Sequence, residues 1–169
     1  MDNLKANKIL ILGSSGSGKS TLAKHLATQL NSQVFYYDQI RWLENWNQPS
    51  REEVISKLTE ITKNESYILE GTYSSKLKLV ADDCDMIIVL EIPTLRCTYR
   101  ILKRTFTSFI TGKKGAREDL PEGCNEKLGI GYLRFIKYTL TYHKELKEMY
   151  AELAEHKDKI TILKRNIKL

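Results

Sequence analysis

The chain has 169 residues, of which 41% are hydrophobic and 28% charged, so it is long enough for one domain with a sizeable core. No apolar run approaches the roughly 20 residues that a bilayer-spanning helix needs. The net charge of +6 is uneven: residues 1–90 hold 10 basic and 11 acidic side chains, which leaves 17 basic and 10 acidic side chains for the rest, a distribution that suits nucleotide phosphates or nucleic acid.

Five short apolar runs predict strands. Taken in chain order, they cover residues 8–12, 34–37, 66–70, 85–92 and 159–163. The first is continuous and ends at a glycine, which is typical of a strand buried on both faces of a sheet. Because strands alternate with helices and crossovers are right-handed, we expect a mainly parallel sheet with helices on both sides, a three-layer α/β/α fold.

The stretches between these strands show helical periodicity. Leucines recur every four residues from Leu22 to Leu30, and Ser50 with Glu53 forms a capping box before the next helix. A third helix begins at Thr94 and runs to about residue 109. In the last helix the following residues lie near one expected face: Leu133, Ile136, Leu140, His143, Met149 and Leu153.

Residues 13–20 read Gly-Ser-Ser-Gly-Ser-Gly-Lys-Ser and fit the phosphate-loop pattern G-x-x-x-x-G-K-[ST] at every fixed position. Glycines let the backbone wrap around phosphates, and the N-terminus of the following helix adds partial positive charge. We expect Lys19 to reach the β- and γ-phosphates, Ser20 to ligate Mg²⁺ and Thr21 to contact the α-phosphate. The expected nucleotide-binding residues are Gly13, Ser14, Ser15, Gly16, Ser17, Gly18, Lys19, Ser20 and Thr21.

Two other nucleotide-binding classes fit less well. Gly16 and Gly18 followed by Asp38 superficially match a dinucleotide fingerprint, but its third glycine position holds Thr21, and Lys19 would have no role. A GTPase switch would carry an Asn-Lys-x-Asp sequence that reads the base, and this chain has none.

Acidic residues end two of the expected strands, where ligands bind in open α/β sheets. Glu70 ends the third strand and is expected to hold Mg²⁺, although an ordinary strand-end acid has the same pattern. Asp38 ends the second and is expected to orient or deprotonate an acceptor hydroxyl, unless it only forms a turn. Arg41, Trp42 and Trp46 follow in a loop that either lines an acceptor pocket or covers the sheet edge.

Basic residues gather in the second half of the chain. Arg96, Arg100 and Arg104 recur every four residues and share one helix face. Residues 111–127 combine glycines, a proline and charges, which predicts a loop. A basic lid hinged at glycines would supply the cations and the exclusion of water that phosphoryl transfer needs, while a solvated basic face is the alternative. We therefore expect Arg100 and Arg104 to be catalytic, and the lid to contribute Lys113, Arg117 and Arg134.

The three cysteines form no CxxC pair and leave an odd thiol, which predicts reduced cysteines in a cytoplasmic protein. They are Cys84, Cys97 and Cys124. Because Cys124 has no partner cysteine in the loop, we do not expect a zinc-bound lid.

Several motifs together resemble a known group of proteins. They are ILGSSGSGKSTL at 11–22, DQIRW at 38–42, ILEGTY at 68–73, PTLRCTYRILKR at 93–104 and LPEGC at 120–124. On these motifs, which span nearly the whole chain, it resembles small P-loop kinases of the adenylate kinase-like class and, more closely, bacterial DNA topology modulation (FlaR-like) proteins. In one of them the chain departs from the group, because Glu70 and Thr72 stand where the group has Asp and Asn.

The resemblance implies a specific architecture: one domain, 1–169, with a five-stranded parallel sheet in the order 2-3-1-4-5. It also implies an acceptor-binding region at about 38–80, to which Gly71 and Tyr73 belong with Asp38, Arg41 and Trp46, and a helical or loop lid at about 105–130. ATP is the expected nucleotide, with GTP left open because only six residues, 164–169, follow the last strand.

Two functions from different classes remain after these arguments. The first is an ATP- and Mg²⁺-dependent phosphotransferase acting on a nucleoside, a nucleotide or another small metabolite. The second is a nucleotide-binding regulator associated with DNA that has no small-molecule acceptor, which the group's name and the basic second half allow. The sequence shows no helix-turn-helix, zinc-finger or RNA-binding motif for that role. It leaves the acceptor and the oligomeric state open.

Overall fold

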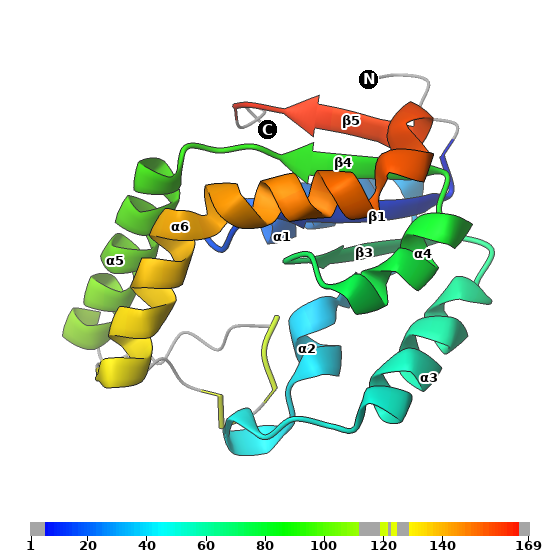
Figure 1. Cartoon of the computed structure of the whole chain (residues 1–169). Coiled ribbons are helices and arrows are strands. Elements are labelled where there is room, and N and C mark those ends of the chain that lie inside the picture. Colours follow the sequence, from blue (N-terminus) through cyan, green and yellow to red (C-terminus); the bar gives the residue numbers. More distant parts are fainter. Residues whose placement is uncertain (1–5, 112–118, 122, 125–128, 166–169) are drawn as a thin grey trace.

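A computed structural model of the chain describes residues 6–111, 119–121, 123, 124 and 129–165. It contains a five-stranded parallel sheet in the order β2-β3-β1-β4-β5, which confirms the expected fold (Figure 1). The strands are β1 Lys8–Gly13, β2 Val34–Tyr36, β3 Tyr67–Gly71, β4 Met86–Leu90 and β5 Ile160–Leu163.

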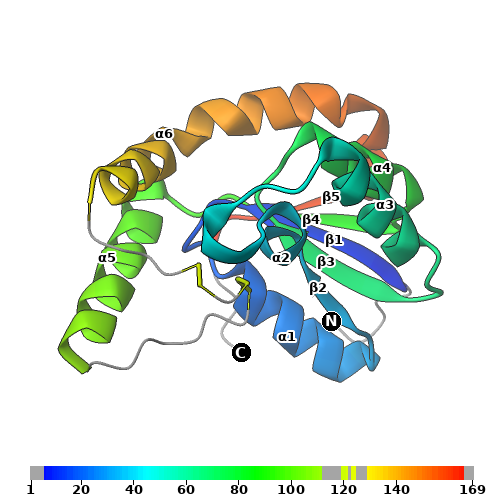
Figure 2. The ribbon, with the colours of Figure 1, turned by 90° about the horizontal axis from the view of Figure 1, so that it is seen from below.

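Helices cover both faces of this sheet (Figure 2). They are α1 Lys19–Leu30, α2 Tyr37–Arg41, α3 Arg51–Thr62, α4 Lys78–Asp83, α5 Thr94–Thr111 and α6 Ile130–Glu152. Short 3₁₀ turns are η1 Glu44–Trp46, η2 Ser75–Leu77 and η3 Ala154–Lys159. The capping box that starts α3 is confirmed: the Ser50 hydroxyl accepts from the Glu53 amide at 3.1 Å, and the Glu53 carboxylate accepts from the Ser50 amide at 2.7 Å.

The side chains of β1 alternate between two cores. Leu10 and Leu12 belong to a core shared with α3, α4 and α6, while Ile9 and Ile11 pack with α1 on the other face. All four are completely buried, because a central parallel strand has helices on both sides. The continuous apolar run that identified this strand in the sequence is therefore a consequence of its place in the middle of the sheet.

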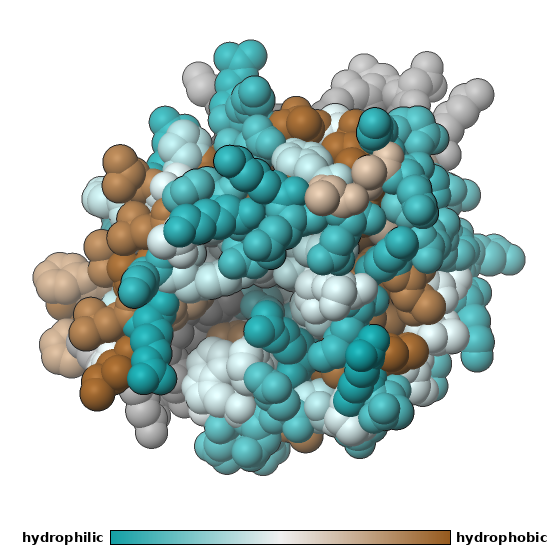
Figure 3. Space-filling view, in the orientation of Figure 1, coloured by the Kyte–Doolittle hydropathy of each residue, from teal (hydrophilic) through white to brown (hydrophobic). Residues whose placement is uncertain are grey.

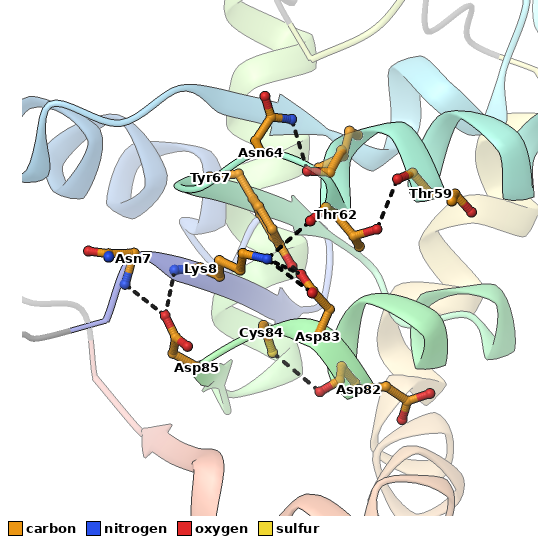
Figure 4. A network of polar contacts seen from close by, with 12 residues as sticks. Asn7, Lys8, Thr59, Thr62, Asn64, Tyr67, Asp82, Asp83, Cys84 and Asp85 are labelled. Carbon is orange, nitrogen blue, oxygen red and sulfur yellow. Dashed lines mark hydrogen bonds and ion pairs between the residues drawn. The ribbon is translucent and has the colours of Figure 1, made fainter.

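A polar network ties together the amino ends of the central strands (Figure 4). Asp83 accepts hydrogen bonds from the Lys8 ammonium at 3.0 Å and from the Tyr67 hydroxyl at 2.8 Å. Asp85 accepts from the backbone amides of Asn7 and Lys8 at 2.9 Å. Burial and the Asp83 carboxylate raise the pKa of Tyr67 above its ordinary value. These contacts fix the strand register at the end of the sheet away from the phosphate loop.

Helix α6 packs differently from the expectation. Leu133 and Leu140 are exposed, whereas Tyr132, Thr139 and Tyr142 are buried together with Met149. Burial of Tyr132 is compatible with its polar hydroxyl, because that hydroxyl donates to Thr105 Oγ1 of α5 at 3.0 Å. No helix in the described ranges is long and apolar enough to cross a membrane.

Candidate functional site

The phosphate loop joins β1 to α1 at the carboxyl edge of the sheet. Gly16 and Gly18 have φ angles of +76° and +99°, a left-handed conformation that favours glycine. A turn closes inside the loop, where the Ser17 amide donates to the Ser14 carbonyl at 3.2 Å. The loop thus leads directly into the amino end of a twelve-residue helix, the arrangement that binds anions through backbone N–H groups.

Gly16 also lies against α5, and this contact yields a prediction. A Cβ atom at Gly16 would stand 2.6 Å from the Cys97 carbonyl oxygen. Because the φ angle is also left-handed, Gly16→Ala should lower the free energy of unfolding by about 2 kcal/mol and weaken nucleotide binding. Gly131→Ala is the control, since no described residue lies within 4 Å of the added Cβ. Urea denaturation of both variants checks this; equal stabilities would contradict it.

Lys19 lies in a cavity of about 380 Å³ above the loop. Its side chain is almost buried, its Nζ donates to the Ser14 carbonyl at 3.0 Å, and it lies 4.0 Å from Glu70 Oε2. The cavity is lined by Ser15, Gly16, Gly18, Lys19, Ser20, Thr21, Asp38, Glu70, Arg100, Arg104 and Asp119. Most of the expected nucleotide-binding residues are therefore brought together; Gly13, Ser14 and Ser17 lie beneath the lining, and Ser14 and Ser17 are buried.

Glu70 is placed beside the loop by the sheet register. It pairs with Ile11 of β1 on one side and with Tyr36 of β2 on the other, at the carboxyl edge of all three strands. Glu70 is 4% exposed, and its Oε1 accepts from the Ser20 hydroxyl at 3.1 Å. Its Oε2 has no hydrogen bond within the described part of the chain.

The Ser20–Glu70 pair has the chemistry of a Mg²⁺ site. The Lys19 ammonium lies 4.0 Å from Glu70 Oε2, too far for a hydrogen bond, so a cation in direct contact would satisfy this buried oxygen better. No cluster of three or more histidine, cysteine or acidic side chains suited to a metal occurs among the described residues. Mg²⁺ does not need one, because it is usually held by one or two protein oxygens together with nucleotide phosphates and water. The residues present therefore fit this ion.

The same carboxylate gives a pH-dependent prediction. Burial raises the pKa of Glu70 above its ordinary value of 4.5, although the nearby Lys19 ammonium opposes the shift. The folded chain therefore binds a proton at Glu70 more tightly than the unfolded chain does, so stability falls as the pH rises from 4.5 through the raised pKa. Glu70→Gln removes this loss, so at pH 8 the variant should melt at a higher temperature than the wild type.

Thermal denaturation without nucleotide or metal measures this effect. The difference between Glu70→Gln and the wild type should shrink at pH 5, where more of the wild-type carboxyl is protonated. Glu65→Gln, a change at an exposed acid just before β3, serves as the control and should leave the melting temperature unchanged. A difference that is independent of pH would show that Glu70 is not destabilised by ionisation.

A second cavity, of about 1030 Å³, adjoins the first. Ser15 and Asp38 line both. Of the expected acceptor residues, Arg41, Trp46 and Tyr73 line the larger cavity with Asp38, and Trp42 lies there as well. Gly71 does not: it faces α2, where a Cβ would stand 2.6 Å from Tyr37 Cβ. Sequence reasoning missed Lys76 and Glu145 in this lining, because neither belongs to a recognisable motif.

Helix α5 brings its arginines to different places. Arg100 and Arg104 line the smaller cavity, and Arg100 also donates to the Gly16 carbonyl at 3.3 Å. Arg96, on the preceding turn, is exposed and lines neither cavity. Arg134 of α6 is likewise exposed and outside both linings. Lys113 and Arg117 lie outside the described residues.

Residues beyond α5 return to the wall of the larger cavity. The Cys124 thiol is buried, donates to the Leu43 carbonyl at 3.3 Å and accepts from the Trp46 amide at 3.4 Å. All three cysteines are free thiols, and burial raises the pKa of Cys84 to about 12. The contact explains why a buried cysteine occurs in a polar loop: it pairs with the backbone of the segment that carries the tryptophans.

Comparisons with known proteins agree on the fold. A family model described as Novel STAND NTPase 3 matches residues 1–56, the third of the chain that holds the phosphate loop. No curated protein gives a significant match. Among solved structures, shikimate kinase from Acinetobacter baumannii in complex with shikimate is 14% identical, with a TM-score of 0.59 over 96% of this chain and 86% of that one.

Two further structures have the same arrangement. Shikimate kinase from Bacteroides thetaiotaomicron is 12% identical, with a TM-score of 0.52 over 94% of this chain and 86% of that one. The YorR protein from Bacillus subtilis, in complex with phosphorylated GDP, is 13% identical, with a TM-score of 0.52 over 92% and 85% of the two chains. At these identities the likeness concerns the fold. The chain therefore has the fold of P-loop kinases.

Proposed function

We propose that the chain is an ATP- and Mg²⁺-dependent phosphotransferase whose acceptor is a small molecule with a hydroxyl group. The observation that carries this proposal is the pair of adjoining cavities that share Ser15 and Asp38. The smaller contains Lys19 and the Ser20–Glu70 pair, which suit a nucleoside triphosphate. Adjoining sites for donor and acceptor are what in-line phosphoryl transfer needs.

The residues around the junction have complementary roles in this proposal. The acceptor oxygen bonds to the γ-phosphorus while the bond from that phosphorus to the bridging oxygen breaks and ADP leaves. Asp38 orients the acceptor hydroxyl and receives its proton. Lys19, Arg100 and Arg104 neutralise charge on the transferring phosphoryl group. Mg²⁺, when held by Ser20 and Glu70, supplies positive charge to the β- and γ-phosphate oxygens.

The larger cavity favours an acceptor with a planar ring. Seven aromatic side chains line it, with tryptophans on one wall and α6 on the other: Tyr37, Trp42, Trp46, Tyr73, Tyr132, Phe135 and Tyr138. Trp42 and Trp46 contact each other edge to face, with ring centroids 5.4 Å apart. Aromatic side chains bind flat rings by stacking on them. A non-planar sugar or polyol ring gains less binding energy from such contacts. A nucleoside or nucleotide acceptor therefore fits this cavity better than a cyclic polyol.

Motifs and fold together support a finer assignment. We assign the chain to the DNA topology modulation (FlaR-like) proteins, as one domain with an acceptor region at about 38–80 and a lid at about 105–130. The contact between Cys124 and the Leu43–Trp46 segment supports a lid that reaches the acceptor wall. The three free thiols support a reducing compartment, the cytoplasm.

ADP formation by the purified protein tests this function. ATP·Mg²⁺ and GTP·Mg²⁺ are supplied as donors, with nucleosides, nucleoside monophosphates and shikimate-type cyclic polyols as acceptors. We expect ATP-dependent turnover that nucleosides or nucleotides stimulate at least about tenfold over polyols, the effect of one good stacking contact. Phosphorylated acceptor, identified by mass spectrometry, must equal the ADP formed.

Two results would contradict the proposal in different ways. Stimulation by polyols alone would leave a kinase but overturn the planar-ring acceptor. If the protein binds nucleotide but no acceptor stimulates ADP formation, the kinase proposal is overturned and the DNA-associated regulator is favoured. DNA binding that falls steeply with salt and shows no sequence preference would in that case reflect only the basic second half of the chain.

A further inference from the structure

Helix α5 presents a stripe of exposed apolar side chains to solvent. The stripe consists of Leu95, Tyr99, Leu102, Phe106 and Phe109, whose exposed fractions run from 47% to 75%. Figure 3 shows apolar residues gathered over this helix, at the left edge of the molecule. Scattered apolar residues are ordinary on a surface, but a row that runs along one helix from Leu95 to Phe109 is not.

The stripe faces away from both the core and the nucleotide cavity. Successive residues of a helix turn by about 100°, so Arg104 lies on the side opposite Leu102 and Phe106. Arg104 lines the nucleotide cavity, and Cys97 and Ile101 form the buried side of the helix. No residue of the stripe lines either cavity, and none belongs to the buried core.

The start of α6 extends this surface. Ile130 and Leu133 are 73% and 68% exposed, and the Tyr132 hydroxyl holds this part of α6 against Thr105 of α5. Ile110, at the end of α5, is also exposed. The two helices thus present one apolar surface, which we call the α5–α6 face: the stripe together with Ile110, Ile130 and Leu133.

The spacing within the stripe indicates the kind of partner. Its residues are separated by 4, 3, 4 and 3 positions. This spacing is typical of the apolar seam along which two helices pack knobs into holes. The eight side chains of the α5–α6 face, at roughly 100–150 Å² of exposed surface each, offer on the order of 1,000 Å². A stable dimer buries about 800 Å² on each partner. We propose that two copies of this chain associate through the α5–α6 face, helix pair against helix pair.

Charges beside the stripe predict how salt affects this association. Arg96 and Lys103 border it on one side, and the other border is formed by Thr98 and Thr105, so no acidic residue of α5 faces the two cations. Two copies brought together repel through these like charges, and salt screens the repulsion. Self-association should therefore strengthen with ionic strength. An anionic membrane, the other surface that a basic amphipathic helix suits, would be bound less tightly in salt.

Sedimentation equilibrium of the full chain tests the proposal, at about 1–100 µM protein and at low and high NaCl. We expect a species of twice the 19.6 kDa chain mass, favoured by the higher salt. Leu102→Asp puts a charge in the middle of the seam and should weaken dimerisation at least about 100-fold. Leu79→Asp makes the same change at an exposed residue of α4 and should leave the dimer intact. Circular dichroism and ATP binding show that both variants fold.

Every other outcome overturns the proposal. A chain that remains monomeric at 100 µM protein and high salt has no such interface. A dimer that Leu102→Asp leaves intact forms through another face. A monomer that binds phosphatidylglycerol vesicles, and releases them as salt rises, uses the α5–α6 face for a membrane instead. None of these results bears on ADP formation, so the proposed function is tested separately.

Discussion

Replacing Lys19 with alanine is expected to lower kcat/KM for ATP by about 10³-fold, the loss typical of a preorganised group that stabilises transition-state charge. In the structure the ammonium group of Lys19 lies in the smaller cavity, where it donates to the Ser14 carbonyl at 3.0 Å and lies 4.0 Å from the Glu70 carboxylate. A triphosphate entering the cavity would offer the cation stronger acceptors than one carbonyl. Loss of the Lys19 ammonium therefore removes both binding energy for the triphosphate and neutralisation of its charge.

ADP release at saturating acceptor, with ATP affinity measured by calorimetry, checks the expectation. Lys24→Ala is the control, because Lys24 is an exposed lysine on the same helix α1, outside the cavity lining. Turnover by Lys19→Ala within tenfold of the wild type would contradict the assignment of residues 13–20 as the phosphate loop. If unfolding caused the loss of turnover, the melting temperature of Lys19→Ala would be lower than that of the wild type.

Asp38→Asn is expected to lower kcat by about 10³-fold with little change in the KM for ATP, as for removal of a general base. Among the described residues, only Ser15 and Asp38 line both cavities, so Asp38 is the acid of α2 and β3 that can face an acceptor. The amide keeps the shape of the side chain, and α2 keeps its backbone bond from the Trp42 amide to the Asp38 carbonyl. A selective loss of kcat therefore separates a catalytic role from a turn-forming one.

Glu145→Gln is the matched control for this experiment. Glu145 is an acid that lines the larger cavity but not the smaller one. The kcat of Glu145→Gln should therefore differ from that of the wild type by less than about tenfold. Equal losses of kcat in the two variants would show that the effect is not specific to Asp38. An unchanged kcat in Asp38→Asn with a lower melting temperature would leave Asp38 as a structural residue of α2.

Local rules explain why so much of the fold could be predicted. Continuous apolar runs identified β1, β3 and β4, because a central parallel strand is buried on both faces. The Ser50–Glu53 capping box is confirmed, since both of its hydrogen bonds join residues three apart. Helices α2 and α4 were missed: with five and six residues they are too short to show a helical period.

The strand and long-helix segments and the phosphate loop follow from local patterns of residue type, and the strand order was implied by the resemblance. Contacts between side chains far apart in the chain depend on packing instead. Cys124 bonds to the backbone of Leu43, 81 residues away, and α6 buries Tyr132 and Tyr142 instead of Leu133. Tertiary structure also decided that Asp38 stands between two cavities and that the apolar row of α5 faces solvent. Periodicity reports that a helix has an apolar face, but only packing determines what covers that face.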